Sequence, residues 1–124
     1  MLEAAVLIDK DFNPIHWHTP EDRSTAALPD SRSLWDVIWA NREKLNGIAH
    51  THPGPGWPYP SIEDITTFEA VESGLGKRLD WWIASSDGLV LLRWEGNDYF
   101  RFRMMDAMQP HWLARLRELS NYGR

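Results

Sequence analysis

The sequence predicts an α/β fold in which one mixed β-sheet lies between helices. Short apolar runs typical of buried strands alternate with segments whose apolar residues recur at helical spacing. Clusters of Gly, Pro, Asn and Asp separate these segments and indicate turns. The expected order of elements is ββαβαβββα. With 43% apolar and 12% aromatic residues, a chain of 124 residues can bury one sizeable core, so we expect a single domain over residues 1–124.

Two short strands are expected first. Residues 4–8 form a continuous apolar run that charged residues close, which suits a buried strand entering a turn. A second strand is expected over residues 14–18. Residues 19–33 mix Pro, Asp, Ser and Arg without periodicity, and this pattern predicts a loop.

A helix is expected to follow this loop. Its apolar residues recur at helical spacing, and Ser33 is a plausible N-cap. Asn46 and Gly47 are expected to end it. The residues on its apolar face are Leu34, Val37, Ile38 and Leu45.

The central part of the chain predicts a strand and then a second helix. Residues 48–52 form a short strand that carries two histidines at its C-terminal end, where binding groups gather in open α/β sheets. The helix is expected from Ser61 to about Ser73, with Gly74 and Gly76 ending it. Its expected inward face consists of Ile62, Ile65, Phe68 and Val71.

The last third of the chain predicts three strands and a helix. Residues 78–85 and 89–94 flank Ser-Asp-Gly, a strong hairpin signal. Residues 99–104 are expected to pair next to this hairpin. A helix over residues 110–119 closes the chain, with Trp112, Leu113 and Leu116 facing inward.

The composition excludes several classes of function. A net charge of -5 and a pI of about 5.4 provide no basic field for a nucleic-acid backbone. The C-terminal and strand arginines are interpreted as solvated faces. They are Arg101, Arg103, Arg115, Arg117 and Arg124.

The absence of cysteine excludes disulfides, thiolate zinc sites and a cysteine nucleophile. The N-terminal residues lack the features of a signal peptide, and no run approaches the roughly 18 apolar residues that cross a bilayer. We therefore expect a soluble, cytoplasmic protein that binds neither membranes nor nucleic acid.

The most informative segment runs from His50 to Asp64. Side chains alternate along a strand, so His50 and His52 point the same way and can reach one ion. Asp64 can supply a third ligand. Three N or O ligands with one position left for water describe a catalytic zinc site, whereas a structural site closes its shell with a fourth protein ligand. The expected chemistry is hydrolysis.

Ser61 and Asp64 also have an explanation that needs no metal. Ser-x-x-Asp before an amphipathic run approximates a capping box, in which the serine hydroxyl accepts a hydrogen bond from the first helical turn. This interpretation does not account for the two histidines just upstream or for the proline-rich loop that follows them.

The pattern His-x-His-Pro, a short loop and then Pro-Ser-x-x-Asp resembles the signature of the JAB/MPN/JAMM metalloprotease family. The resemblance covers residues 3–94, and its specific part is the segment from His50 to Asp64. It implies an α/β sandwich of JAB/MPN type, similar in architecture to cytidine deaminases. Eight residues separate His52 from Ser61, where the family usually has seven. The chain lacks room for the insertions of eukaryotic deubiquitinases, so a compact prokaryotic member is the better comparison.

The resemblance also implies roles for individual residues. His50, His52 and Asp64 would hold Zn²⁺. Glu3, 47 residues before His50, would accept the proton of the attacking water and pass it to the leaving amine. Ser61 would donate a hydrogen bond to the developing oxyanion, which its position at a helix start permits.

Six other side chains need separate interpretation. His16 and His18 repeat the His-x-His pattern on a strand but lack a nearby carboxylate, so we interpret them as surface histidines that could orient a ligand only if that strand borders the site. His111 is interpreted as a surface or packing residue, and Glu63 as a favourable charge in the first helical turn. Two aromatic residues of the loop, Trp57 and Tyr59, could wall a peptide groove or shield the loop.

The leading functional hypothesis is a zinc-dependent isopeptidase or peptidase, and its substrate class follows from the resemblance alone. The substrate would be the C-terminal tail of a ubiquitin-like or sulfur-carrier protein. A non-catalytic scaffold module is the first alternative. A DNA-associated protein of RadC type is the second, and the acidic charge disfavours it. A zinc nucleobase deaminase needs a cysteine-pair motif that this chain lacks.

Overall fold

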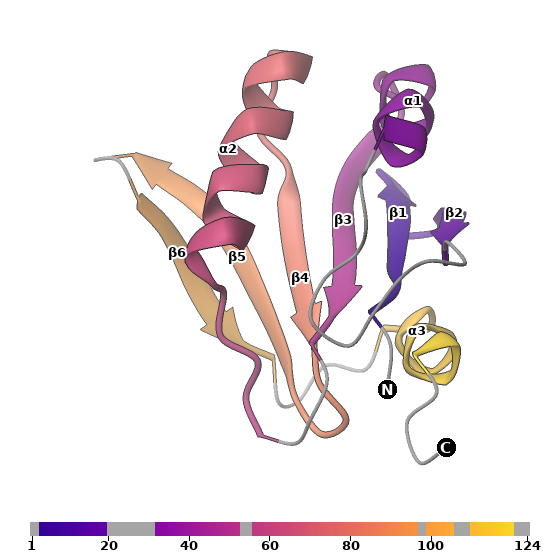
Figure 1. Ribbon diagram of the computed structural model, residues 1–124, viewed down its shortest axis with the longest axis vertical. Coiled ribbons are helices and arrows are strands. Elements are labelled where there is room, and N and C mark those ends of the chain that lie inside the picture. Colours follow the sequence, from indigo (N-terminus) through magenta and orange to yellow (C-terminus); the bar gives the residue numbers. More distant parts are fainter. Residues whose placement is uncertain (1–2, 20–31, 53–55, 97–98, 106–109, 121–124) are drawn as a thin grey trace.

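The computed structural model describes residues 3–19, 32–52, 56–96, 99–105 and 110–120 (Figure 1). The chain is a mixed α/β fold, as the sequence predicts. Its strands and helices follow one another as β1 (Ala5–Asp9), β2 (Pro14–His18), α1 (Arg32–Ala40), β3 (Leu45–Thr51), α2 (Ile62–Leu75), β4 (Asp80–Ala84), β5 (Leu89–Gly96), β6 (Tyr99–Met104) and α3 (Leu113–Leu119).

The strands form one mixed sheet in the order β2-β1-β3-β4-β5-β6. β3 and β4 are parallel and are connected through α2, whereas the other neighbouring strands are antiparallel. β3 is therefore a central strand with a helical crossover directly after it, the arrangement that gathers binding groups at the carboxyl ends of strands.

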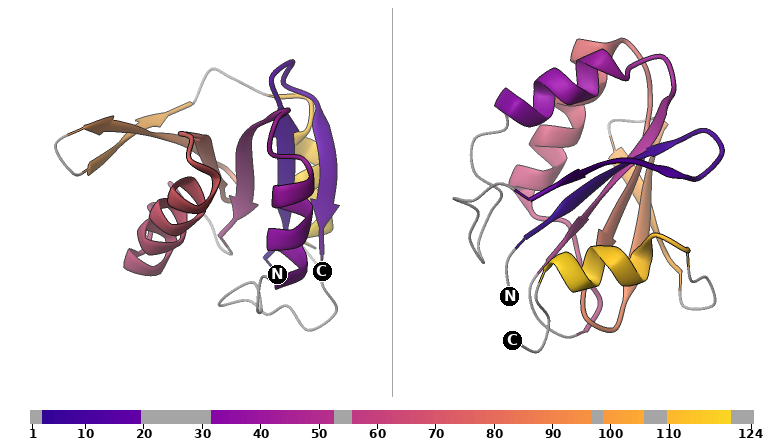
Figure 2. Two further views of the ribbon diagram at one scale, coloured as in Figure 1. Left: turned by 90° about the horizontal axis from the view of Figure 1, so that it is seen from above. Right: turned by 90° about the vertical axis from the view of Figure 1, so that its right-hand side faces the viewer.

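The sheet has helices on both faces because its central strands are apolar on both faces. Leu7, Ile48 and Ile83 belong to the core cluster under α1 and α2. Their neighbours Val6, Ala49 and Trp82 belong to a second cluster under α3. Figure 2 shows α3 on the side of the sheet away from α1 and α2. Buried strands of this kind have apolar residues in unbroken runs.

The expected boundaries of the first helix are wrong at both ends. Ser33 lies inside α1 and is not its cap, and the helix ends at Ala40. Asn46 and Gly47 belong to β3. A Cβ atom at Gly47 would overlap the carbonyl oxygen of Asp80 and lie 2.8 Å from the Trp82 ring. This glycine therefore permits the close approach of β3 and β4. The sequence suggests a helix end here because glycine is also common directly after helices.

The second helix also differs from expectation. Ile62 is 87% exposed and does not face the core, whereas Phe68 is buried and Ile65 and Val71 pack at the edge of the core cluster. The helix continues past Gly74, where a Cβ atom would lie 2.8 Å from the Trp35 ring of α1. Only Gly76, with φ of 70°, ends it in the left-handed conformation.

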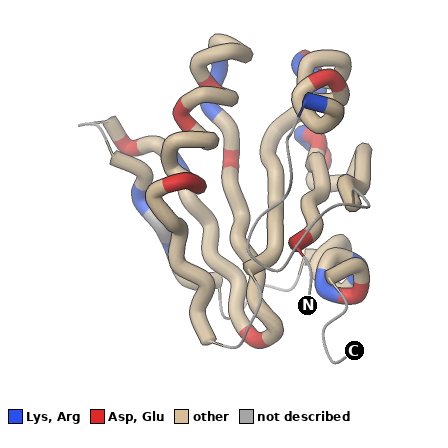
Figure 3. The backbone as a smooth tube through the Cα atoms, viewed as in Figure 1, with Lys and Arg blue, Asp and Glu red and all other residues tan. Residues whose placement is uncertain are grey.

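The arginines expected on solvated faces divide into two groups. Arg101, Arg103 and Arg115 are exposed, and Figure 3 shows the basic positions of β6 and α3 on opposite sides of the molecule. Arg117 is half-buried and donates to the carbonyl oxygens of Ser85 and Gly88, so its solvated interpretation is wrong. Arg124 lies outside the described residues.

Two further expectations can be compared with the structure. Most of the expected loop, residues 20–31, lies outside the described part of the chain, and residues 32 and 33 are helical. None of the described helices is both long and apolar enough to cross a bilayer.

Candidate metal centre

The two histidines lie at the carboxyl end of β3. His50 is the next-to-last residue of the strand, and His52 follows the last residue, Thr51. The backbone remains extended because His52 N–H donates to the Ala84 carbonyl at 2.8 Å. The Nε2 atoms of the two imidazoles lie 3.2 Å apart, so both point to one place.

Asp64 approaches the same place from the first turn of α2. Its Oδ1 lies 3.3 Å from Nε2 of His50, and its Oδ2 lies 2.9 Å from Nε2 of His52. The structure thus brings together the three residues that the sequence analysis assigned to a metal.

The capping box predicted from Ser-x-x-Asp is present as well. Asp64 N–H donates to Ser61 Oγ at 3.0 Å, and Ser61 N–H donates to Asp64 Oδ2 at 2.8 Å. The capping and metal-site interpretations are therefore compatible, because the carboxylate that caps the helix also contacts both imidazoles. Ser61 Oγ accepts one bond in this arrangement and keeps its own O–H to donate.

The distances within the cluster suit a small tetrahedral cation. Zinc binds nitrogen and oxygen ligands at about 2.0–2.2 Å, so neighbouring ligand atoms of a tetrahedral site lie about 3.3–3.5 Å apart. The separations of 3.2, 3.3 and 2.9 Å between the two imidazole nitrogens and the Asp64 oxygens are close to this spacing. His50 and His52 contact different oxygens of Asp64, and the spacing is compatible with three ligands around one cation.

Glu3 lies next to the histidine pair. It is only 6% exposed, and its carboxylate, His50 and His52 each offer a ligand atom within 4.8 Å of the others, so this group could hold a metal ion. Ala5, two residues later, pairs with His50 across the β1–β3 ladder. Glu3 thus lies beside the site although it stands near the start of the sequence.

The backbone next to Glu3 is held by Thr51. Ala4 N–H donates to Thr51 Oγ1 at 2.9 Å, and Thr51 N–H donates to the Ala4 carbonyl at 3.0 Å. Thr51 Oγ1 also lies 2.6 Å from Oγ of Ser120, at the end of α3. All of these groups are buried, which restricts the fraying expected near a terminus.

The electrostatics of the cluster favour a positive charge. Burial acts to raise the pKa of Asp64, but hydrogen bonds from His50 and His52 outweigh it and hold that pKa well below its usual range. Burial acts to lower the pKa of His52, but the hydrogen bond and charge of Asp64, with the charge of Glu3, raise it overall. A bound divalent cation would supply positive charge at the same place.

The interpretation of His18 as a surface histidine is wrong. It is 7% exposed, and its Nε2 has no hydrogen-bond partner among the described residues. Burial and the neighbouring charge of His16 lower its pKa, which favours the neutral imidazole. Its strand borders the site, because His18 pairs with Ala5 and Ala5 pairs with His50 on the other side. His16 is half-buried.

The remaining candidates lie as follows. Trp57 is half-buried and packs against the core, whereas Tyr59 is 54% exposed. Glu63 is an exposed acid in the first turn of α2. His111 is exposed and touches the edge of the Phe12 ring. Trp57 therefore packs inward from this loop, and Tyr59 is the more accessible of the two aromatic residues.

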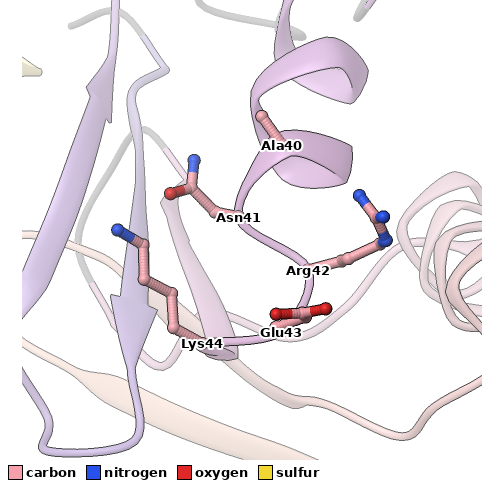
Figure 4. A pocket seen from close by; sticks show the side chains of 5 residues that line it. All are labelled: Ala40, Asn41, Arg42, Glu43 and Lys44. Atoms are coloured by element: carbon pink, nitrogen blue, oxygen red, sulfur yellow. The ribbon is translucent and has the colours of Figure 1, made fainter.

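A cavity of about 320 Å³ lies elsewhere, at the turn between α1 and β3 (Figure 4). Residues 40–44 line it. This turn precedes β3, whereas the histidines lie at the other end of that strand. The cavity is thus not part of the metal centre. The candidate site is identified by its converging ligand atoms and not by a cavity.

Sequence reasoning missed the residues that support the site from a distance, namely Thr51, Ser85, Asp87, Arg117 and Ser120. Each acts through hydrogen bonds to residues far away in the chain, and only the position of Thr51 between the two histidines gave a signal.

No protein-family model and no curated protein matches this sequence.

Proposed function

We propose that this protein is a zinc-dependent isopeptidase or peptidase that cleaves an amide bond at the C-terminal tail of a ubiquitin-like or sulfur-carrier protein. The observation that carries this proposal is the convergence of two imidazole nitrogens and a carboxylate within 3.3 Å of one another, with a second carboxylate beside them. The resemblance of the His50 to Asp64 segment to JAMM metalloproteases supplies the reaction and the substrate class.

His50, His52 and Asp64 are the proposed zinc ligands. When bound in such a site, zinc lowers the pKa of a water molecule to about 7 and polarises a carbonyl group. Three protein ligands leave a position open for this chemistry. Neutral imidazoles and an ionised carboxylate are the forms that bind a metal, and the depressed pKa of Asp64 keeps its carboxylate ionised.

Glu3 and Ser61 are the proposed catalytic residues. The Glu3 carboxylate accepts a proton from the attacking water and delivers it to the leaving amine. The Ser61 hydroxyl donates a hydrogen bond to the oxygen that becomes negative as the carbonyl is attacked. In this scheme the burial of Glu3 favours proton transfer to the leaving amine, because little bulk water can reach the carboxylate and take the proton instead.

The depth of the site favours an extended substrate. His50 is 9% exposed and Glu3 is 6% exposed, so the reacting groups are recessed below the surface. A flexible tail can enter such a site more readily than a folded surface can. Tyr59, exposed in the loop that leads to Ser61, can pack against an entering chain.

One observation favours a second candidate, a non-catalytic docking module. Asp64 already pairs with both histidines and with the Ser61 backbone, so the described cluster is satisfied without a metal. In that case the contacts of Asp64 with the two histidines would only hold α2 against the end of β3.

The decisive experiment measures cleavage of a sulfur-carrier or ubiquitin-like protein that carries a C-terminal peptide extension. We expect activity that a chelator abolishes, that Zn²⁺ restores and that His50→Ala lacks. His111→Ala is the matched control, because it removes an exposed histidine outside the cluster. Activity that survives both chelation and His50→Ala would refute the proposal.

A further inference from the structure

Two described residues between β3 and α2, His52 and Gly56, are hydrogen-bonded to the end of β4 and to the turn that follows it. His52 N–H donates to the carbonyl of Ala84, the last residue of β4, at 2.8 Å. Gly56 N–H donates to Asp87 Oδ1 at 2.6 Å, and Ser85 Oγ donates to the Gly56 carbonyl. Both polar groups of the Gly56 backbone are therefore held by side chains of this turn.

We infer that Ser85 and Asp87 are positioning residues that hold Asp64 in place against the histidine pair. The inference rests on the proposed zinc site, and it assigns to these two residues a role in metal affinity. Neither residue contacts the cluster in any described hydrogen bond, so they act through the loop backbone.

Residues 56–58 lie close against the turn. A Cβ atom at Gly88 would lie 3.1 Å from the Gly56 carbonyl oxygen, 3.1 Å from the Trp57 ring and 3.2 Å from Cδ of Pro58. Trp57 continues from this contact into the core cluster under α2. A glycine at position 88 thus permits the close approach that the two side-chain hydrogen bonds then hold.

The turn itself is rigidly supported. Ser85 N–H donates to the Gly88 carbonyl, and Gly88 N–H donates to Ser85 Oγ, each at 3.0 Å. From α3, Arg117 donates to the carbonyl oxygens of Ser85 and Gly88 at 2.9 and 3.2 Å. A loop attached to this turn is therefore attached to the body of the sheet.

The attachment matters because it shortens the chain that can move between the metal ligands. Eight residues separate His52 from Ser61, and the entropic cost of holding the ends of a flexible segment together grows with its length. Fixing Gly56 divides this segment, and packing of Trp57 restricts the second part. Releasing Gly56 lets the start of α2 sample positions in which Asp64 no longer contacts His50 and His52, so zinc would bind more weakly.

The test is a competition titration of Zn²⁺ against a chromogenic chelator, run on the full chain together with the thermal unfolding of the metal-free protein. We expect Asp87→Ala to weaken zinc binding by about 10-fold to 100-fold, the range typical for residues that orient metal ligands. Asp87→Asn should restore most of the affinity, because its amide oxygen still accepts from Gly56 N–H. Asp36→Ala, which removes an exposed acid on α1, is the matched control and should bind zinc as the wild type does.

Gly88→Ala provides a second variant that keeps every hydrogen-bonding side chain. Its added methyl group requires residues 56–58 to shift by a few tenths of an ångström, and we expect weaker zinc binding here as well. Wild-type affinity in both Asp87→Ala and Gly88→Ala would overturn the inference and leave the zinc site standing. A weaker affinity in Asp87→Ala that Asp87→Asn fails to restore would also overturn it. A wild-type protein that binds no zinc would refute the proposed function itself, and the inference with it.

Discussion

The two carboxylates of the candidate site, Glu3 and Asp64, are brought to the histidine pair in different ways. Glu3 lies two residues before Ala5, the first residue of β1, and the pairing of β1 with β3 places Ala5 opposite His50. The buried hydroxyl of Thr51 reinforces this pairing. Asp64 lies outside the sheet, on the first turn of α2, and depends on the Ser61 cap and on the loop held by Asp87.

The two carboxylates therefore depend on different parts of the fold. The position of Glu3 is coupled to the sheet, so changes that disturb it should also lower the stability of the fold. The position of Asp64 is coupled to a helix cap and a loop, so changes there can alter metal binding while the sheet remains intact. α3 supports both, through Ser120 at Thr51 and through Arg117 at the turn.

The largest expected effect distinguishes Asp64, a proposed zinc ligand, from Glu3, a proposed proton acceptor. Asp64→Ala removes a proposed ligand, and we expect zinc affinity to fall by more than about 100-fold, beyond the range typical of supporting residues. Glu3→Gln should retain most of the zinc and lose peptidase activity, because an amide cannot accept the proton. Elemental analysis and a cleavage assay on both variants measure this contrast. Equal zinc loss in the two variants would show that Glu3 is itself a ligand.

The next effect tests how the sheet holds Glu3. Thr51→Val removes the hydroxyl that Ala4 N–H and Ser120 Oγ contact, and leaving such groups unpaired in a buried position costs about 1–3 kcal/mol. Ser120→Ala removes one partner of the threonine and leaves its bond to Ala4, so we expect a smaller loss. Urea denaturation of both variants checks this order, and the reverse order would contradict it.

A smaller effect tests the cap on the Asp64 side. Ser61→Ala removes the acceptor for Asp64 N–H and should destabilise the protein by about 1 kcal/mol. Ser61→Thr keeps a hydroxyl that can both cap the helix and donate to an oxyanion, so it should preserve stability and activity. If Ser61→Ala unfolds at the wild-type denaturant concentration, the cap contributes nothing to the fold.

The smallest effect concerns His18, next to the Glu3 side of the sheet. Because burial lowers its pKa below 6.5, the unfolded chain takes up a proton there at a pH where the folded protein does not. Its contribution to stability is therefore lost as the pH falls from about 6.5 toward the folded-state pKa. We expect His18→Leu to flatten the decline in melting temperature between pH 7 and pH 5. An unchanged decline would show that His18 takes up its proton with the same pKa in the folded and the unfolded protein.

Much of the fold could be predicted because its signals are local. The bounds of β2 and β6 agree with the predicted strands, and Trp112, Leu113 and Leu116 are buried as expected. Gly47 was misread because a glycine that permits close strand packing is indistinguishable, in sequence, from one that ends a helix. Ile62 was misplaced because the apolar spacing continued to a residue that the helix start leaves exposed.

The candidate site was predictable to the extent that it is compact in sequence. His50, His52 and Asp64 lie within 15 residues, and alternation along a strand places both imidazoles on one face. The supporting contacts join residues 29 to 69 positions apart, such as Gly56 with Ser85 and Thr51 with Ser120. No periodicity encodes such pairs. The burial of His18 was missed for the same reason, because burial depends on what packs above a strand.

The central claim is that His50, His52 and Asp64 share one metal ion, and anomalous diffraction at the zinc absorption edge tests it most directly. Crystals grown with Zn²⁺ should show one strong peak about 2.0–2.2 Å from both imidazole Nε2 atoms and from an Asp64 oxygen. A well-ordered cluster without such a peak, with Asp64 still paired directly to both histidines, would contradict the account.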